Sequence, residues 1–383
     1  MDAKYAFRRQ VLEQFGARGT EIDELLTYNQ NIFDHNALQS LRLPLDDEPF
    51  VAAWQTYAEE ARTLGTFEAL KTRLVQLRFP IQQGISQTEV YAQAVKKGIL
   101  PPHVLQSQGL PLRHPESLEL RIHQTPAGKI PVLIAGERED FVALLQALTF
   151  RNEPEPVPPS QGAAMIAGYN NWDRIWTLKE AMIWEKGELY VNMFWSQEFQ
   201  KILPQKHMYQ DKFILVSPRY YSGVAPESLG LEEDMWKDLS VTIRLEHECT
   251  HYFTKRVLSS MQNKLLDELI ADYAGITAAA GRFRADWFLT FLGLEHYPVY
   301  REGARLQNYR GTPPLSDRAF AILQALVYQA AHKLERYANA CPAKQTVMVA
   351  LTSMTLEELA SDQSEALLRE HQQLYEPFFH PNA

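Results

Sequence analysis

The motif H-E-x-x-H at residues 247–251 is the feature that most constrains how this chain can fold. Two histidines four residues apart share one face when the segment is a helix. The surrounding residues 241–257 contain no Gly or Pro and end in a basic pair, which the helix dipole favours at a C-terminus. We therefore predict a helix here, and the candidates for its N-cap are Asp238 and Ser240.

The spacing of this motif is that of a metal site. On a helix, the Cβ atoms of His247 and His251 lie about 5–6 Å apart, so both imidazoles can reach one Zn²⁺ at about 2.0–2.1 Å. Glu248 is offset by roughly 100° from His247. Its carboxylate then lies beside the metal, where it can take a proton from metal-bound water and deliver it to a leaving group. The motif predicts one zinc ion with Glu248 as general base.

A catalytic zinc site needs a third protein ligand and an open position. The metzincin extension would require Gly at position 254 and His at position 257, but the chain has Thr254 and Val257. Residues 263–280 indicate a second helix, on which Glu268 and Asp272 lie four residues apart on one face. We expect Glu268 to complete the ligand set and Asp272 to accept the outer ring N–H of a histidine ligand.

H-E-x-x-H followed by E-x-x-x-D on a second helix resembles the gluzincin class of zinc metallopeptidases, to which the thermolysin-like enzymes belong. The match covers about residues 238–280. It implies a helix-rich α+β fold with a zincin-like core, in which a small sheet accompanies an active-site helix and a glutamate helix. It also implies a peptide or protein substrate. By position, the resemblance makes His247, His251 and Glu268 zinc ligands, Glu248 the base and Asp272 the partner of His247.

The proposed chemistry also needs a hydrogen-bond donor for the oxyanion, typically a Tyr or His from a later helix. Tyr328 and His332 lie four residues apart in the helical pattern of residues 318–337, so we predict that these two residues are catalytic candidates. A second aromatic and basic cluster follows the glutamate helix and is expected at the rim of the cleft. Its members are His296, Tyr300, Arg305 and Tyr309.

Composition and charge indicate which classes of partner to expect. With 38 Lys and Arg against 47 Asp and Glu, the net charge is −9, and such a surface repels phosphate backbones. No stretch approaches the roughly 18 apolar residues of a membrane helix, and the first residues are charged where a signal peptide would be apolar. We therefore expect a cytoplasmic protein without nucleic-acid or membrane partners, and its oligomeric state is open. Cys249 and Cys341 form no disulfide framework, and Cys249, at about 200° from His247, is expected to be a buried small side chain.

The prolines suggest where the chain divides. A length of 383 residues predicts two domains, or one elaborated catalytic domain with an added module. Four prolines lie in residues 153–159, a segment that can enter neither a helix interior nor a central strand. We predict a Pro-rich join at 153–160. It would separate a mainly helical N-terminal domain of unknown role (1–152, with a β-hairpin at 118–135) from a zincin-like catalytic domain (161–383) with a helical C-terminal part.

Two further segments have the composition of strands. GELYVNMFW (187–195) and DKFILVSPRYY (211–221) are rich in β-branched and aromatic residues, and one of them is expected at the sheet edge where an extended peptide would bind. A helix at about 137–149 should follow the hairpin. Residues 84–98 have the pattern of a capped helix, with Ser86 as the cap, and less readily that of a helix-turn-helix.

Together these patterns predict a zinc-dependent hydrolase, specifically a metallopeptidase. Two alternatives stay open: a metal-stabilised binding or regulatory protein without catalysis, and a zinc hydrolase that acts on a non-peptide amide. The sequence lacks G-x-x-x-x-G-K-[ST], G-x-G-x-x-G and G-x-S-x-G, so phosphate-binding loops and the serine nucleophile elbow have no signature here.

Overall fold

A computed structural model describes residues 3–36, 38 and 41–379 and divides the chain into two compact units. Unit 1 combines Met1–Leu45 with Tyr220–Ala383, and unit 2 is Asp46–Arg219. The predicted join at 153–160 therefore lies inside unit 2 and does not separate two units. Its prolines do keep it irregular, but it is held to the body of the unit because the Arg138 guanidinium donates hydrogen bonds to the carbonyls of Pro158 and Gln161.

Unit 2 contains a four-stranded mixed sheet with strand order β1-β2-β4-β3. The predicted hairpin is confirmed: β1 (Glu119–Thr125) and β2 (Gly128–Ile134) are antiparallel. Strand β4 (Gln210–Val216) is parallel to β2 and antiparallel to β3 (Ala163–Asn170). Because β4 lies between two other strands, the expectation that residues 211–221 form the sheet edge is wrong.

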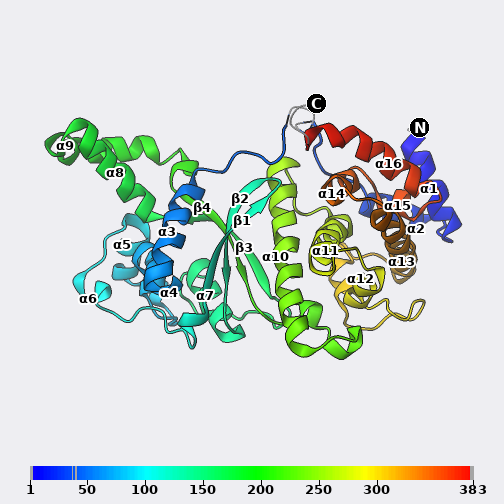
Figure 1. The fold of residues 1–383 in the computed structure, drawn as a ribbon, viewed down its shortest axis with the longest axis horizontal. Coiled ribbons are helices and arrows are strands. Elements are labelled where there is room, and N and C mark those ends of the chain that lie inside the picture. Colours follow the sequence, from blue (N-terminus) through cyan, green and yellow to red (C-terminus); the bar gives the residue numbers. More distant parts are fainter. Residues whose placement is uncertain (1–2, 37, 39–40, 380–383) are drawn as a thin grey trace. The chain divides into compact units, whose positions relative to one another are not determined.

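Helices of unit 2 lie beside the sheet (Figure 1), and one hydrophobic core joins them to it. Helix α3 (Phe50–Leu64) contributes Trp54, whose ring lies 4.8 Å from that of Phe213 on β4. Helix α7 (Arg138–Thr149) confirms the predicted helix after the hairpin and buries its apolar stripe in the same core. Shorter helices complete this part: α4 (Thr66–Arg73), α5 (Glu89–Lys97) and α6 (Pro102–Leu105).

Residues 84–98 form a short 3₁₀ turn (Ile85–Gln87) followed by the single helix α5. The cap is Thr88, whose hydroxyl accepts a hydrogen bond from the Tyr91 N–H, and not Ser86 as predicted. The Ser86 N–H instead donates to the Glu153 carboxylate. The segment is thus a capped helix, as the sequence pattern favoured.

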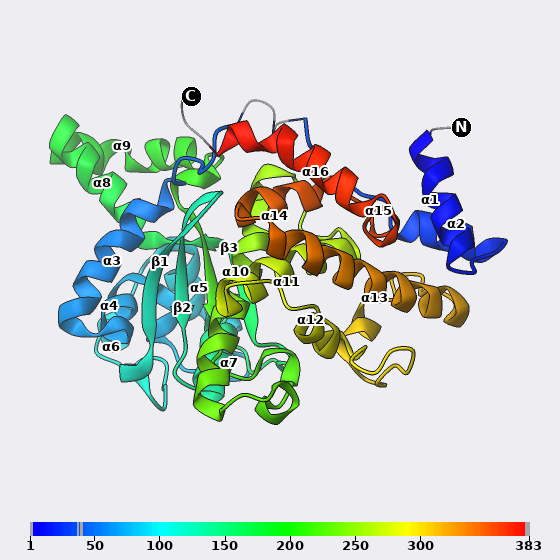
Figure 2. The ribbon, with the colours of Figure 1, turned by 45° about the vertical axis from the view of Figure 1, so that its right-hand side comes forward.

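The predicted strand at 187–195 is wrong, because these residues lie at the start of a helical hairpin. Helices α8 (Trp172–Lys186) and α9 (Glu188–Ile202) are joined at Gly187, whose φ of +86° lies in the region that favours glycine. The bias of residues 187–195 toward aromatic and β-branched side chains resembles that of a strand, but these side chains serve helix–helix contacts or are exposed. The hairpin extends from the rest of unit 2 (Figures 1 and 2).

Unit 1 is helical in its described part, as expected beyond residue 238. The N-terminal helices α1 (Ala3–Gln14) and α2 (Thr20–Tyr28) pack with the C-terminal helices. A buried ion pair of 3.1 Å between Arg8 and Glu357 joins α1 to α15. Figure 2 shows α16 beside α14. The bounds of the later helices are α12 (Ala285–Leu292), α13 (Asp317–Ala340), α14 (Lys344–Thr352), α15 (Leu356–Ala360) and α16 (Ser364–Tyr375).

Helices α10 (Glu233–Val257) and α11 (Lys264–Ala280) pack closely against each other and confirm both helices predicted around the motif. Helix α10 starts earlier than predicted, so both expected caps, Asp238 and Ser240, lie inside it. The buried Ser240 hydroxyl accepts the Tyr221 N–H. Gly275 permits the close approach, since a Cβ there would lie 2.5 Å from the Ile243 carbonyl oxygen. The helix-rich α+β class is thus confirmed, and among the described residues no helix is both long and apolar enough to span a membrane.

Candidate metal centre

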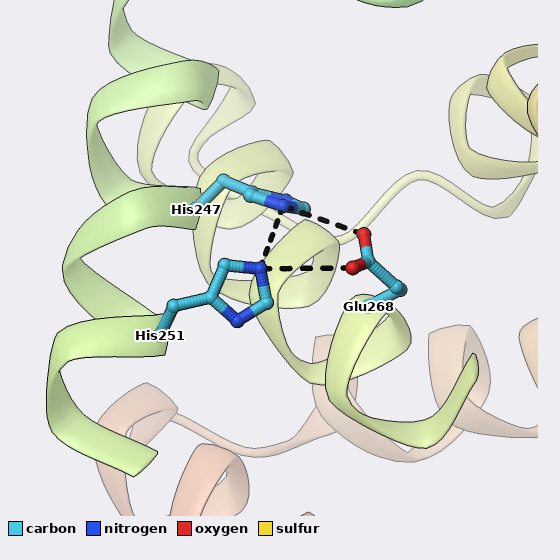
Figure 3. Close-up of side chains that lie close together, drawn as sticks. All are labelled: His247, His251 and Glu268. Carbon is cyan, nitrogen blue, oxygen red and sulfur yellow. Dashed lines mark hydrogen bonds and ion pairs between the residues drawn. The ribbon is translucent and has the colours of Figure 1, made fainter. Parts of the chain in front are cut away.

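Three side chains from α10 and α11 meet with their polar atoms facing one another (Figure 3). The Nε2 atoms of His247 and His251 are 3.0 Å apart. The Glu268 carboxylate lies opposite, with Oε2 3.5 Å from Nε2 of His247 and Oε1 3.8 Å from Nε2 of His251. Both imidazoles are buried, and the Glu268 side chain is 19% exposed. This triad could hold a metal ion.

The size of the triad fits a small divalent cation. Two ligand atoms bound at about 2.0–2.1 Å in a tetrahedral site lie about 3.3 Å apart. The three distances between donor atoms, 3.0, 3.5 and 3.8 Å, bracket that value. Two nitrogens and one carboxylate leave room for a fourth, non-protein ligand, as in catalytic zinc sites.

His247 is oriented by a buried carboxylate, at the position predicted for its partner. Its Nδ1 lies 2.9 Å from Asp272 Oδ1. The same oxygen accepts the Tyr221 hydroxyl at 2.5 Å, and Arg305 donates to the other oxygen of Asp272. Burial alone would raise the pKa of Asp272, but Arg305, His247 and Tyr221 outweigh it and lower that pKa to about 2. Asp272 is therefore ionised, which fixes the His247 N–H on Nδ1.

His251 is oriented by a second carboxylate that sequence reasoning missed. Its Nδ1 lies 3.3 Å from Oδ2 of Asp267, which is 1% exposed, and the Thr254 hydroxyl donates to the other oxygen of Asp267. Burial disfavours the imidazolium form of His251, but Asp267 and Glu268 outweigh it and raise the pKa of His251 to about 9. Asp267 directly precedes Glu268, and an acidic pair at the third ligand is the signal that could have identified it.

These contacts decide which nitrogen lone pairs face the centre. His247 Nδ1 is hydrogen-bonded to Asp272, so its N–H belongs on Nδ1 and its Nε2 lone pair points inward. His251 Nδ1 lies at ion-pair distance from Asp267, which favours the same arrangement. Two lone pairs 3.0 Å apart beside a carboxylate repel one another unless a cation lies between them. A proton on His251 relieves part of this repulsion. A divalent metal ion would relieve it for His247, His251 and Glu268 together.

Glu248 follows His247 on α10 and is half-buried. Among the residues that the structure describes, no hydrogen bond or ion pair engages its carboxylate. Its negative charge is the smallest of the contributions that raise the pKa of His251, after those of Asp267 and Glu268. A carboxylate without a protein partner is available to exchange protons.

The loop before α13 supplies Tyr309, from the cluster expected at the rim. Its hydroxyl donates to Glu268 Oε2 at 2.8 Å, and its backbone carbonyl accepts the hydroxyl of Tyr28 from α2. A 3₁₀ turn (Arg305–Tyr309) carries both Tyr309 and Arg305. The glutamate side of the triad is therefore held by this turn, which in turn contacts the N-terminal helices.

The two predicted oxyanion donors lie elsewhere on α13. Tyr328 stacks on Tyr297 with ring centroids 4.5 Å apart, and His332 packs edge-on against Tyr328 at 4.6 Å. In the described part of the chain, neither makes a hydrogen bond to the triad. The other members of the rim cluster also serve their own loop: His296 pairs with Val299 in an isolated bridge, and the Tyr300 hydroxyl donates to the Ala304 carbonyl.

Cys249 lies inside α10 and is 3% exposed. Burial raises the pKa of its thiol, with further contributions from Glu246 and Glu248. A neutral thiol in this position is a packing residue. The expectation of a buried small side chain is confirmed.

Comparison with known proteins yields one match. A model of a protein family described as a family of unknown function (DUF7005) matches residues 10–363. No curated protein and no solved structure matches the chain. The family match spans the metal centre and most of both units, and the chain therefore belongs to DUF7005.

Proposed function

We propose that this chain is a zinc-dependent hydrolase of gluzincin type that cleaves peptide bonds, with a zincin-like core formed around α10 and α11. The observation that carries the proposal is the donor set itself: two Nε2 atoms and one carboxylate, each histidine backed by its own buried aspartate. Structural zinc sites almost always have four protein ligands, whereas three with an open position are typical of catalysis.

Zinc is the metal that this donor set favours under the proposal. Two imidazoles and a carboxylate, at the spacing of a tetrahedral site, suit zinc better than calcium or magnesium. Those two ions prefer oxygen ligands and higher coordination numbers. When bound, zinc supplies Lewis acidity toward a carbonyl and makes water acidic enough to ionise near neutral pH.

The remaining roles fall to residues of the chain. In this proposal Glu248 accepts a proton from the attacking water and delivers it to the leaving amine. Asp272 and Asp267 hold the Nδ1–H tautomers of His247 and His251. Tyr309, instead of Tyr328 or His332, brings a hydroxyl to the triad.

The test is the isosteric replacement Glu248→Gln, read by zinc content and by mass-spectrometric profiling of a peptide mixture. Zinc should stay at the wild-type level while cleavage falls by about 10²–10⁴-fold. The matched control is Asp238→Asn, which removes an exposed carboxylate from the same helix and should leave both readouts unchanged.

Unchanged cleavage by Glu248→Gln would exclude its role as general base. If the zinc-loaded wild type cleaves no peptide but hydrolyses other amides, the substrate class is wrong and the hydrolase assignment stands. If it hydrolyses neither, the metal-stabilised binding protein is the better description.

A further inference from the structure

The helical hairpin α8–α9 exposes an unusual amount of apolar side chain. Trp184, Leu189 and Met193 are 92%, 77% and 66% exposed. Trp176 and Tyr190 on the same hairpin are also exposed. Residues 172–202 contain four of the seven tryptophans of the chain. Single exposed apolar residues are ordinary, but five on one two-helix element form a surface that indicates a partner.

The aromatic packing contacts of the hairpin are concentrated near its base. Near the body of unit 2, Trp172 packs against Phe199, and Trp195 stacks on the same ring at 5.8 Å. Toward the connection at Gly187, the main aromatic contact is Tyr190 on Phe194 at 4.9 Å, within one helix. Helices of 15 residues are marginal in water unless an amphipathic face is packed. In the outer half, Val191 is fully buried whereas Trp184, Leu189 and Met193 stay exposed, so packing within the hairpin covers only part of its apolar surface.

We infer that a second copy of this chain covers the surface formed by Trp176, Trp184, Leu189, Tyr190 and Met193, so that two hairpins pair as a four-helix bundle in a twofold dimer. At about 200 Å² for a large side chain, the exposed fractions of these five side chains leave on the order of 600 Å² of apolar surface. One side of a standard interface buries about 800 Å², of which about 65% is apolar in homodimers. The surface thus has the size that one partner of a stable dimer contributes.

Charge favours a second copy over a membrane. The hairpin carries four basic and five acidic residues, and this mixture of both signs can pair with its own copy. Three of the acidic residues, Glu180, Glu185 and Glu188, lie close to the most exposed apolar side chains. Insertion of Trp184 into a bilayer would carry these carboxylates toward lipid, which is costly and is opposed further by anionic headgroups.

The test measures mass by light scattering and sedimentation from 5 to 200 µM with the full-length protein. Wild type should approach twice 44.0 kDa. Trp184→Glu and Leu189→Glu should each weaken the dimer by about 30-fold or more, the effect of losing an interface hot spot. Because both side chains point into solvent in the single chain, circular dichroism melting of the monomer and zinc content should not change. The matched control is Leu64→Glu, which changes an exposed apolar residue on α3 of unit 2, outside the hairpin. This variant should dimerise like the wild type.

A monomeric wild type at 200 µM would overturn the inference, as would a dimer that survives both substitutions. Flotation with phosphatidylcholine vesicles is measured in parallel. A wild type that stays monomeric and floats with vesicles, while Trp184→Glu does not, would identify a lipid surface as the partner and would contradict the dimer.

Discussion

Two pairs of consecutive helices in this molecule use their side chains in opposite ways. Helices α10 and α11 bury their apolar residues, approach closely at Gly275, and place His247, His251 and Glu268 between them. Helices α8 and α9 contact mainly each other and leave Trp184 almost fully exposed. The first pair has the rigidity that a preorganised site needs, whereas the second has the exposed surface that a partner needs. The amino-acid composition of the helices does not distinguish a pair that forms a site from a pair that exposes a surface. The burial of their side chains does.

The largest expected effect is the loss of metal from the first pair. His251→Ala removes one of the three proposed ligands and leaves Asp267 and Glu268 without the cation that they face, so zinc affinity should fall by at least about 10³-fold. Zinc stoichiometry by mass spectrometry and competition with a chelator would show this. His332→Ala, which removes a histidine outside the triad, is the control and should keep full occupancy. Equal occupancy in His251→Ala would exclude the ligand assignment.

A matched pair of tryptophan substitutions tests the packing contrast directly. Trp236 on α10 is fully buried against Trp287 and Phe291, and its indole N–H donates to the Val224 carbonyl. Trp236→Ala should lower the free energy of unfolding by about 3–5 kcal/mol, whereas Trp184→Ala should change it by less than about 0.5 kcal/mol. Urea unfolding at a concentration where the protein is monomeric measures both. Similar costs at the two positions would contradict the contrast.

Acid should weaken metal binding at the first pair. Against the effect of burial, Asp267 and Glu268 raise the pKa of His251 to about 9, so at neutral pH the metal-free site holds a proton that zinc must displace. Each unit of pH below 9 then costs about tenfold in affinity, which gives a decrease of about 100-fold from pH 8 to pH 6. Chelator competition across this range measures it, and an affinity independent of pH would show that His251 is not a ligand.

The smallest effect concerns the turn that holds Glu268. Tyr309→Phe removes one hydrogen bond of 2.8 Å to the carboxylate. A net contribution of about 0.5–1.5 kcal/mol predicts zinc binding that is about 2- to 10-fold weaker. Tyr328→Phe is the control, since the Tyr328 ring stacks on Tyr297 away from these contacts. An identical affinity for wild type and Tyr309→Phe would show that the hydroxyl does not position the ligand.

The parts of the site that lie on one helix were predictable, because helix periodicity fixes which residues share a face. Local spacing predicts that His247 and His251 share one face of a helix with Glu248 beside them. It also predicts that Glu268 and Asp272 share one face of the next helix. Tyr221 could not be predicted, since it reaches Asp272 from an irregular segment whose path depends on tertiary packing.

For the fold, too, local patterns were predictable and long-range packing was not. The hairpin β1–β2 and helices α7, α10 and α11 follow from periodicity and turn residues. The joining of Met1–Leu45 with Tyr220–Ala383 in one unit depends on long-range contacts such as Arg8 with Glu357, which leave no local pattern. Residues 187–195 were misassigned because aromatic and β-branched residues favour strands on average, whereas here they belong to a helix with exposed apolar residues.

X-ray absorption at the zinc edge tests the central claim most directly, because it reports both the element and its ligands in the intact protein. The proposed function predicts one zinc per chain, bound by two imidazole nitrogens and by oxygen at about 2.0–2.1 Å, with the imidazole signal reduced in His251→Ala. A zinc–sulfur distance of about 2.3 Å, or protein that binds no zinc at pH 8, would contradict the metal centre formed by His247, His251 and Glu268.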